Sequence, residues 1–181
     1  MHAADITKGD SAQYVGPSFP TDLVNVTTGI DLFQRRLRIT VLANYQGGFN
    51  KFNNTSSFLC GQTVGCPTTQ VPGADLADQA RYIAANVIQP ATLRTSRGYS
   101  ENLNFWRLRE ITVNWTLPDV VARRALRSPG ANVVFGARNL HVWSSYTGED
   151  PEANYSTGNS QSDLLTAGPP TVFTFHLNLK Y

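Results

Sequence analysis

Apolar and polar side chains alternate along the end of the chain. In residues 171–181 every second position is apolar, namely Phe173, Phe175, Leu177, Leu179 and Tyr181. This period of two places the apolar side chains on one face of an extended strand and the polar ones on the other. The stretch has about the 9–11 residues that a tilted strand needs to cross a bilayer. The pattern is typical of an outer-membrane barrel strand, and equally of the edge strand of a soluble β-sandwich.

The same alternation predicts four further strands. Residues 23–47 contain two alternating stretches separated by residues 34–36, which predicts a hairpin with a very tight turn. Residues 104–143 contain two more, joined by a short helical turn that begins with Asp119 as its N-cap. Upstream of Ile111 the alternation changes parity, which predicts either a β-bulge in this strand or the point where it leaves the bilayer.

Long polar segments separate these strand pairs. Residues 48–103 and 144–169 lack the alternation, apart from a short amphipathic helix predicted at Asp75–Asn86, and residues 1–22 form a polar connector. A long irregular segment is uncommon in a compact soluble domain. Short and long connections therefore alternate around five strands. Outer-membrane barrels show this arrangement, with short periplasmic turns and long extracellular loops.

Composition narrows the function classes. The chain has 181 residues, a formal net charge of +2 and 15% charged residues, so nothing indicates a nucleic-acid-binding surface. No stretch approaches the ~20 apolar residues of a membrane helix, so we expect any membrane crossing to be made by strands. The N-terminus has neither the basic nor the apolar region of a signal peptide. We therefore expect the chain to be the C-terminal part of a longer, exported protein.

Two cysteines lie close together in the first long loop. Cys60 and Cys66 have no histidine or further cysteine nearby, so a zinc site would lack ligands. The spacing favours a disulfide, which would indicate an oxidising compartment. Asp150 and Glu152 flank Pro151 in a turn, and this favours a structural role for them over a metal or acid–base pair.

No catalytic constellation is present in the sequence. The three histidines are far apart, and none belongs to a nucleophile or metal motif, so we predict neither an enzyme nor a cofactor. Four aromatic residues are candidates for stacking on sugar rings, although the last two fit an interfacial girdle equally well: Tyr82, Tyr99, Trp143 and Tyr146. Strand parity predicts a set of side chains facing a barrel lumen: Arg38, Asn44, Thr112, Asn114, His176 and Asn178.

Three stretches together resemble a known family. Residues 105–118 resemble the F-x-R-L-R-x-[IVL]-x-[VL]-x-[YW]-x-L-P strand of SusC/RagA-like TonB-dependent outer-membrane transporters, through Arg107, Leu108, Arg109, Leu117 and Pro118. Residues 136–152 resemble their G-x-N-L…Y-x-G-x-D-P-E signature, with one extra residue before the Asn, through Gly136, Asn139, Leu140, Tyr146, Gly148, Asp150, Pro151 and Glu152. The terminal strand, ending in Tyr181, is also similar.

The resemblance implies an all-β fold, an antiparallel transmembrane segment that supplies the final five strands of a barrel of about 22. It places the protein in the outer membrane of a Gram-negative bacterium, in contact with outer-membrane lipid. The rest of the barrel, its plug and the N-terminal part that contacts the TonB complex would lie outside this chain. Family members import oligosaccharides or peptides, with a SusD-like surface lipoprotein as partner.

Two other functions share parts of this pattern or of its setting. A secreted, soluble β-sandwich that binds carbohydrate would share the alternating strands and the pinned loop. An outer-membrane barrel enzyme, such as a lipase or protease, would need a serine–histidine–acid or acid-pair arrangement that this sequence does not offer.

Overall fold

The computed structural model describes residues 1–7, 9, 13–62, 65–155 and 160–181. Contacts divide the chain into two compact units, each assembled from three segments. We call Asp22–Gln46, Phe105–Ser144 and Pro169–Tyr181 the strand unit. The loop unit consists of Met1–Thr21, Gly47–Asn104 and Ser145–Gly168. The predicted segments 1–22, 48–103 and 144–169 each include a few residues outside the described ranges.

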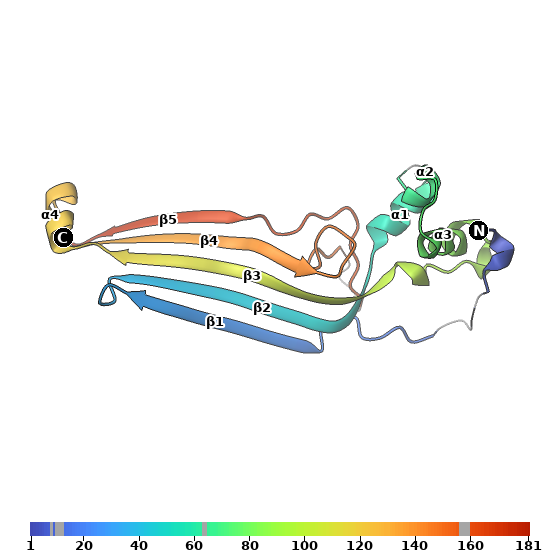
Figure 1. Cartoon of the computed structure of the whole chain (residues 1–181), viewed down its shortest axis with the longest axis horizontal. Helices are drawn as coiled ribbons and strands as arrows, with labels where there is room; N and C mark the ends of the chain where they lie inside the picture. The colour runs from blue at the N-terminus through green and yellow to red at the C-terminus, as the bar shows by residue number, and fades with distance from the viewer. Residues whose placement is uncertain (8, 10–12, 63–64, 156–159) are drawn as a thin grey trace. The chain divides into compact units, whose positions relative to one another are not determined.

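The sheet has five strands in chain order. They are β1 (Asp22–Leu32), β2 (Leu37–Phe52), β3 (Ser100–Thr116), β4 (Ala131–Ser144) and β5 (Val172–Leu179). Each strand is hydrogen-bonded to the next one along the chain, and β3–β4 and β4–β5 are antiparallel (Figure 1). The predicted all-β class and the predicted five strands are confirmed. β1 and β5 are the two edges of the sheet.

The register of the last three strands separates two faces. Thr112 pairs with Gly136, which pairs with Thr174, and the neighbouring rung joins Val113, Phe135 and Phe175. Because side chains on successive residues point to opposite faces, one face carries mainly polar groups and the other apolar ones. The polar face holds Glu110, Thr112, Asn114, Asn132, Arg138, Thr174, His176 and Asn178. The apolar face holds Ile111, Val113, Trp115, Val133, Phe135, Phe173, Phe175 and Leu177.

A bulge interrupts the β3–β4 ladder where the sequence predicted a change of parity. Leu108 pairs with His141 and Glu110 with Arg138, so two steps along β3 correspond to three along β4. The extra residue therefore lies in β4, and the prediction that placed the irregularity in the third strand was wrong on this point. Asn139 has a φ of 52°, a left-handed conformation that asparagine tolerates better than most residues. Its side-chain amide donates to the carbonyl of Pro170 at 3.0 Å, which fastens the bulge to the chain leading into β5.

The two short connections differ in construction. Between β1 and β2, residues Phe33, Gln34 and Arg35 all have positive φ, and the amide of Arg36 donates to the carbonyl of Phe33 at 3.2 Å. Left-handed residues suit a tight hairpin because they follow the twist of the strands. Between β3 and β4 lies helix α4 (Asp119–Leu126). Its N-cap is Pro118 and not Asp119 as predicted, since the Asp119 backbone is already helical.

The segment predicted as one irregular loop is more ordered than expected. β2 continues to Phe52 and β3 begins at Ser100, so both strands extend into the segment that was predicted as loop. Short helices lie between them: α1 (Asn54–Gln62), α2 (Pro67–Gln70), α3 (Leu76–Tyr82), η2 (Ile83–Val87), η3 (Ala91–Leu93) and η4 (Arg97–Tyr99), besides η1 (Ala3–Asp5) near the N-terminus. The predicted helix at 75–86 corresponds to α3 and η2, with Asp75 as the N-cap. No helix among the described residues has both the length and the apolar character to cross a membrane.

Candidate functional site

Polar side chains on the strand unit form two hydrogen-bonded groups. The amide of Asn132 donates to Asn114 Oδ1 at 2.5 Å, and Arg138 Nε donates to Glu110 Oε2 at 2.9 Å. Thr112 donates to the other oxygen of Glu110 at 2.6 Å. Among the predicted lumen-facing residues, this face brings together Thr112, Asn114, His176 and Asn178. Sequence reasoning missed Glu110, Asn132 and Arg138, although the same period of two identifies them.

The remaining two predicted lumen-facing residues lie on β2. Arg38 is 3.9 Å from Asp31 and largely exposed, so this ion pair contributes little to stability. Asn44 is buried, and its Oδ1 accepts a hydrogen bond from Arg109 Nε at 2.7 Å. Arg38 and Asn44 are an even number of residues apart, so a regular strand carries both on one face.

The apolar face of the same strands is exposed. Phe173 and Phe175 are 65% and 67% accessible, and Trp115 on β3 is 48% accessible. Stacking of Phe135 on Phe173, with ring centroids 6.1 Å apart, covers only part of this surface. An apolar surface that spans three adjacent strands is large for a protein in water, and such surfaces mark contacts with membrane or protein.

A buried lysine organises the second long loop of the loop unit. Lys51 is 1% exposed, and its Nζ donates to the backbone carbonyls of Asp150 at 3.1 Å, Pro151 at 3.0 Å and Ala153. The ammonium also lies 4.8 Å from the centre of the Tyr146 ring, which is a cation–π contact. Burial lowers the pKa of Lys51 from its usual 10.5, while nearby carboxylates, chiefly those of Asp163 and Asp150, oppose the shift.

This arrangement explains part of the predicted signature. Tyr146 supplies the ring under the ammonium, and the Asp150–Pro151 turn supplies two of its acceptors. Asp150 Oδ1 also accepts the amide of Glu152 at 2.7 Å, which supports the structural reading of these acidic residues. A Cβ at Gly148 would lie 2.3 Å from the Tyr146 ring, so a larger residue there would displace the ring.

A second buried polar residue joins the same loop to helix α1. Asn53 is fully buried and caps α1, because its Oδ1 accepts the amide of Ser56 at 2.9 Å. Its side-chain amide donates to Glu101 and to Thr147, both at 3.0 Å. Glu101 in turn accepts the backbone amide of Thr147 at 2.9 Å. Neither Lys51 nor Asn53 carried a signal in the sequence beyond being polar at the end of a strand.

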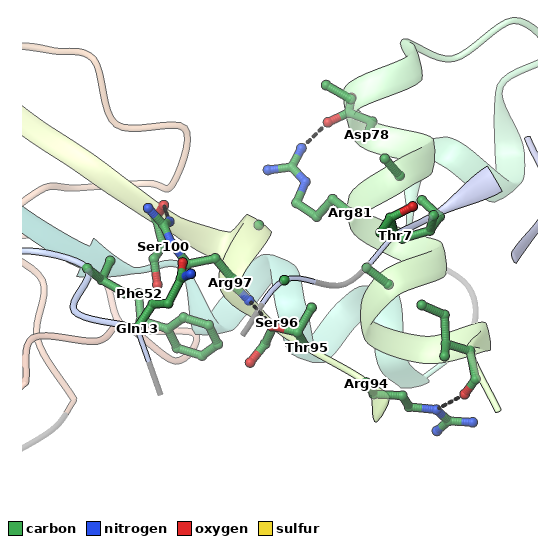
Figure 2. A pocket seen from close by; sticks show the side chains of 18 residues that line it. Thr7, Gln13, Phe52, Asp78, Arg81, Arg94, Thr95, Ser96, Arg97 and Ser100 are labelled. Carbon is green, nitrogen blue, oxygen red and sulfur yellow. Dashed lines mark hydrogen bonds and ion pairs between the residues drawn. The ribbon is translucent and has the colours of Figure 1, made fainter. Parts of the chain in front are cut away.

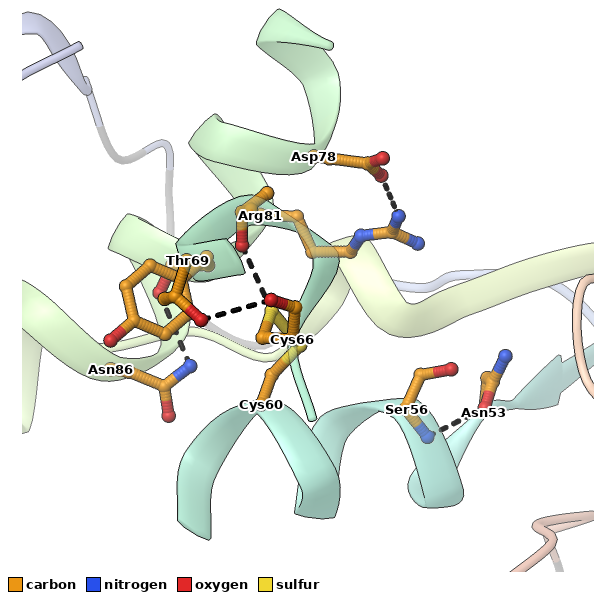
Figure 3. Close-up of a disulfide and its surroundings, with 10 residues drawn as sticks. Asn53, Ser56, Cys60, Cys66, Thr69, Asp78, Arg81 and Asn86 are labelled. Carbon is orange, nitrogen blue, oxygen red and sulfur yellow. Dashed lines mark hydrogen bonds and ion pairs between the residues drawn. A yellow bond between two sulfur atoms is a disulfide. The ribbon is translucent and has the colours of Figure 1, made fainter. Parts of the chain in front are cut away.

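The two cysteines form a disulfide within the loop unit (Figure 3). The pair packs with Tyr99 in a buried cluster, against which Phe52 and Tyr82 also lie. Tyr99 and Tyr146, which the sequence offered for stacking on sugars, are only 2% and 8% exposed and so do not present a free ring face. Burial raises the pKa of both phenols, and the Asp163 carboxylate adds to the shift at Tyr146. Among the described residues, no group of three or more side chains is placed to hold a metal ion.

The remaining signature residues occupy structural positions. Arg107 is 2% exposed within β3, and Leu108 pairs with His141 beside the bulge that contains Asn139 and Leu140. The amide of Leu117 donates to the carbonyl of Ala131 at 3.0 Å, closing the turn that Pro118 begins. Gly136 lies opposite Thr112 on the polar face, and Tyr181 is fully exposed.

The loop unit contains a cavity of about 940 Å³ (Figure 2). Its wall includes three arginines and one carboxylate, namely Arg81, Arg94, Arg97 and Asp78. Apolar wall comes from Ile6, Val15, Phe52, Ala80, Ala84 and Ile88, and hydroxyl groups from Thr7, Thr95, Ser96 and Ser100. No local sequence pattern indicates this site, because the three arginines come to one cavity wall only through the folding of α3 and of the segment around η3 and η4.

Comparison with known proteins gives matches among solved structures. No protein-family model matches the chain, and no curated protein matches it. It is similar to a chain of the RagAB peptide importer in the open-open state, with a TM-score of 0.62 and 21% identity, over 97% of this chain and 19% of that chain. For the closed-closed state of that importer the TM-score is 0.64 and the identity 20%, over 96% of this chain and 19% of that chain.

A structure of the RagAB peptide transporter matches with a TM-score of 0.51 and 19% identity, over 81% of this chain and 16% of that chain. At these identities the likeness establishes the fold. The chain spans about a fifth of the length of the importer chains it matches.

Proposed function

We propose that this chain supplies five strands and two long outer loops to the barrel of an outer-membrane importer for oligopeptides or oligosaccharides. The observation that carries the proposal is the division of the sheet into an exposed apolar face and a hydrogen-bonded polar face. In a membrane barrel the apolar face contacts lipid and the polar face lines the lumen. The likeness to chains of a peptide importer supports the same reading.

The two edges of the sheet indicate that further strands pair with β1 and β5 in the whole protein. All eleven residues of β1 are exposed, and β1 and β5 each have a neighbour on one side only. Unpaired backbone groups at such edges are costly in lipid, where no water can satisfy them. The proposal therefore includes the rest of the barrel and its plug as partners.

The family resemblance supplies the finer parts of the proposal. They are coupling to the TonB complex through a part of the protein outside this chain, a SusD-like lipoprotein partner at the cell surface, and location in the outer membrane of a Gram-negative bacterium. The polar face, with His176 and Asn178, then lines the path of the substrate. The chain has no catalytic role in this proposal.

Refolding with and without detergent micelles tests the proposal. Far-ultraviolet circular dichroism and sedimentation are recorded in both conditions. We expect a β-rich, monodisperse species only with micelles, and aggregates without them, since the apolar face is built for lipid. A soluble monomer that melts cooperatively in plain buffer contradicts the proposal and supports a soluble β-sandwich.

A further inference from the structure

The cavity of the loop unit carries a net positive charge. Arg81, Arg94 and Arg97 contribute three guanidinium groups and Asp78 one carboxylate, which leaves two positive charges on the described wall. The whole chain has a net charge of only +2, so this charge is concentrated locally. The cavity has a volume of about 940 Å³, which lies within the range of about 300–1,000 Å³ that ligand sites occupy.

The side chains of Arg94 and Arg97 are each oriented by one hydrogen bond that leaves other donors available. Arg94 Nε donates to the carbonyl of Ile88 at 3.0 Å, and Arg97 Nη1 donates to that of Ser100 at 3.1 Å. A guanidinium has five N–H donors, so these bonds orient the group without exhausting it. Figure 2 shows Arg94 and Arg97 among the residues that line the cavity.

Arg81 is fixed from two sides. It pairs with Asp78 one turn earlier on α3, and its guanidinium lies 5.2 Å from the centre of the Tyr99 ring. The Tyr99 ring is itself buried beside the disulfide, so the stack has a rigid base. An oriented planar cation of this kind matches the two oxygens of a carboxylate.

From this geometry we propose that the cavity binds the carboxylate groups of a short anionic oligomer. The inference rests on the proposed function and narrows its substrate to molecules that carry carboxylates. The apolar wall accommodates the uncharged parts of such a ligand, and the hydroxyls of Thr95 and Ser96 lie beside the arginines in the wall. Two sources share this chemistry, an acidic oligopeptide and an acidic oligosaccharide.

Direct binding to the full 181-residue chain in micelles tests the inference. The probes are fluorescent tetraglutamate, tetragalacturonate and tetraglutamine, measured by anisotropy at several salt concentrations. We expect tetraglutamate or tetragalacturonate to bind at least about 10-fold more tightly than tetraglutamine, with affinity that falls as salt rises. The anionic probe that binds identifies the source of the carboxylate.

Variants locate the binding to the cavity. The double variant R94Q/R97Q is expected to weaken the anionic probe about 10-fold or more, since it removes two charged donors. R97K keeps the charge but loses the planar fork, so a loss of about 2- to 5-fold is expected. Arg124→Gln, on exposed helix α4 of the strand unit, is the matched control and is expected to change nothing. The circular dichroism spectrum of each variant verifies that it is folded.

Several outcomes overturn the inference. They are equal binding of tetraglutamine, absence of binding by both anionic probes, or unchanged affinity in R94Q/R97Q. Failure of the proposed function is separate, because it is read from the spectrum and sedimentation without micelles. A chain that folds only in micelles yet binds no anionic probe refutes the carboxylate site and leaves the importer proposal intact.

Discussion

Replacing Lys51 by methionine tests whether the buried ammonium holds the second long loop. Methionine retains most of the apolar stem but has no donor, so the carbonyls of Asp150, Pro151 and Ala153 lose their shared partner. Removing one partner of a buried charged network costs about 3–5 kcal/mol. Because the acceptors here are neutral carbonyls and the ammonium itself was costly to bury, we expect the lower end, about 3 kcal/mol.

Hydrogen exchange reports this loss at the loop itself. The amide of Ala153 donates to the carbonyl of Asp150 at 3.2 Å, and that of Tyr155 to Ser162 at 2.7 Å. A loss of about 3 kcal/mol in the stability of the loop corresponds to roughly 100-fold faster exchange of these amides. The exposed Lys180, replaced by methionine, serves as a control and is expected to leave both amides unchanged. Unchanged protection in K51M would show that the loop is held by other contacts and refute the reasoning.

Three further predictions concern the disulfide, the buried phenols and the apolar face. Replacing Cys60 and Cys66 together by serine should lower the stability of the loop unit by about 2 kcal/mol, because the disulfide closes only a short loop. Thermal melts under oxidising conditions measure this loss. Reduced wild-type protein is the control and should lose the same stability. Burial raises the pKa of Tyr146, so the contribution of this phenol to stability is complete below pH 10 and is lost as the pH rises further. A near-ultraviolet titration should therefore show Tyr146 ionising only when the protein unfolds. Ionisation of Tyr146 near pH 10 in the folded protein would contradict the burial argument. Phe175→Lys, on the face proposed to meet lipid, should cost about 2–4 kcal/mol of stability in bilayers, while His176→Lys on the opposite face should cost much less; similar losses for the two variants would refute the assignment of faces.

The sequence by itself determined the five strands and the separation of their faces. Period-two alternation is a local property, because each side chain's face follows from its parity along the strand. This places Thr112, Asn114, His176 and Asn178 together on one side without knowledge of the pairing. The change of parity upstream of Ile111 also indicated an irregularity at this point of the ladder, although the extra residue lies in β4.

Only the tertiary structure decided the strand in which the bulge lies and the two sites of the loop unit. Assigning the extra residue to β4 required the register against β3, which pairs residues far apart in the chain. Lys51 meets its acceptors about 100 residues later, and the three arginines come to one cavity wall through the packing of short helices. Contacts across such separations follow from how loops close and pack, which no local pattern of hydrophobicity encodes.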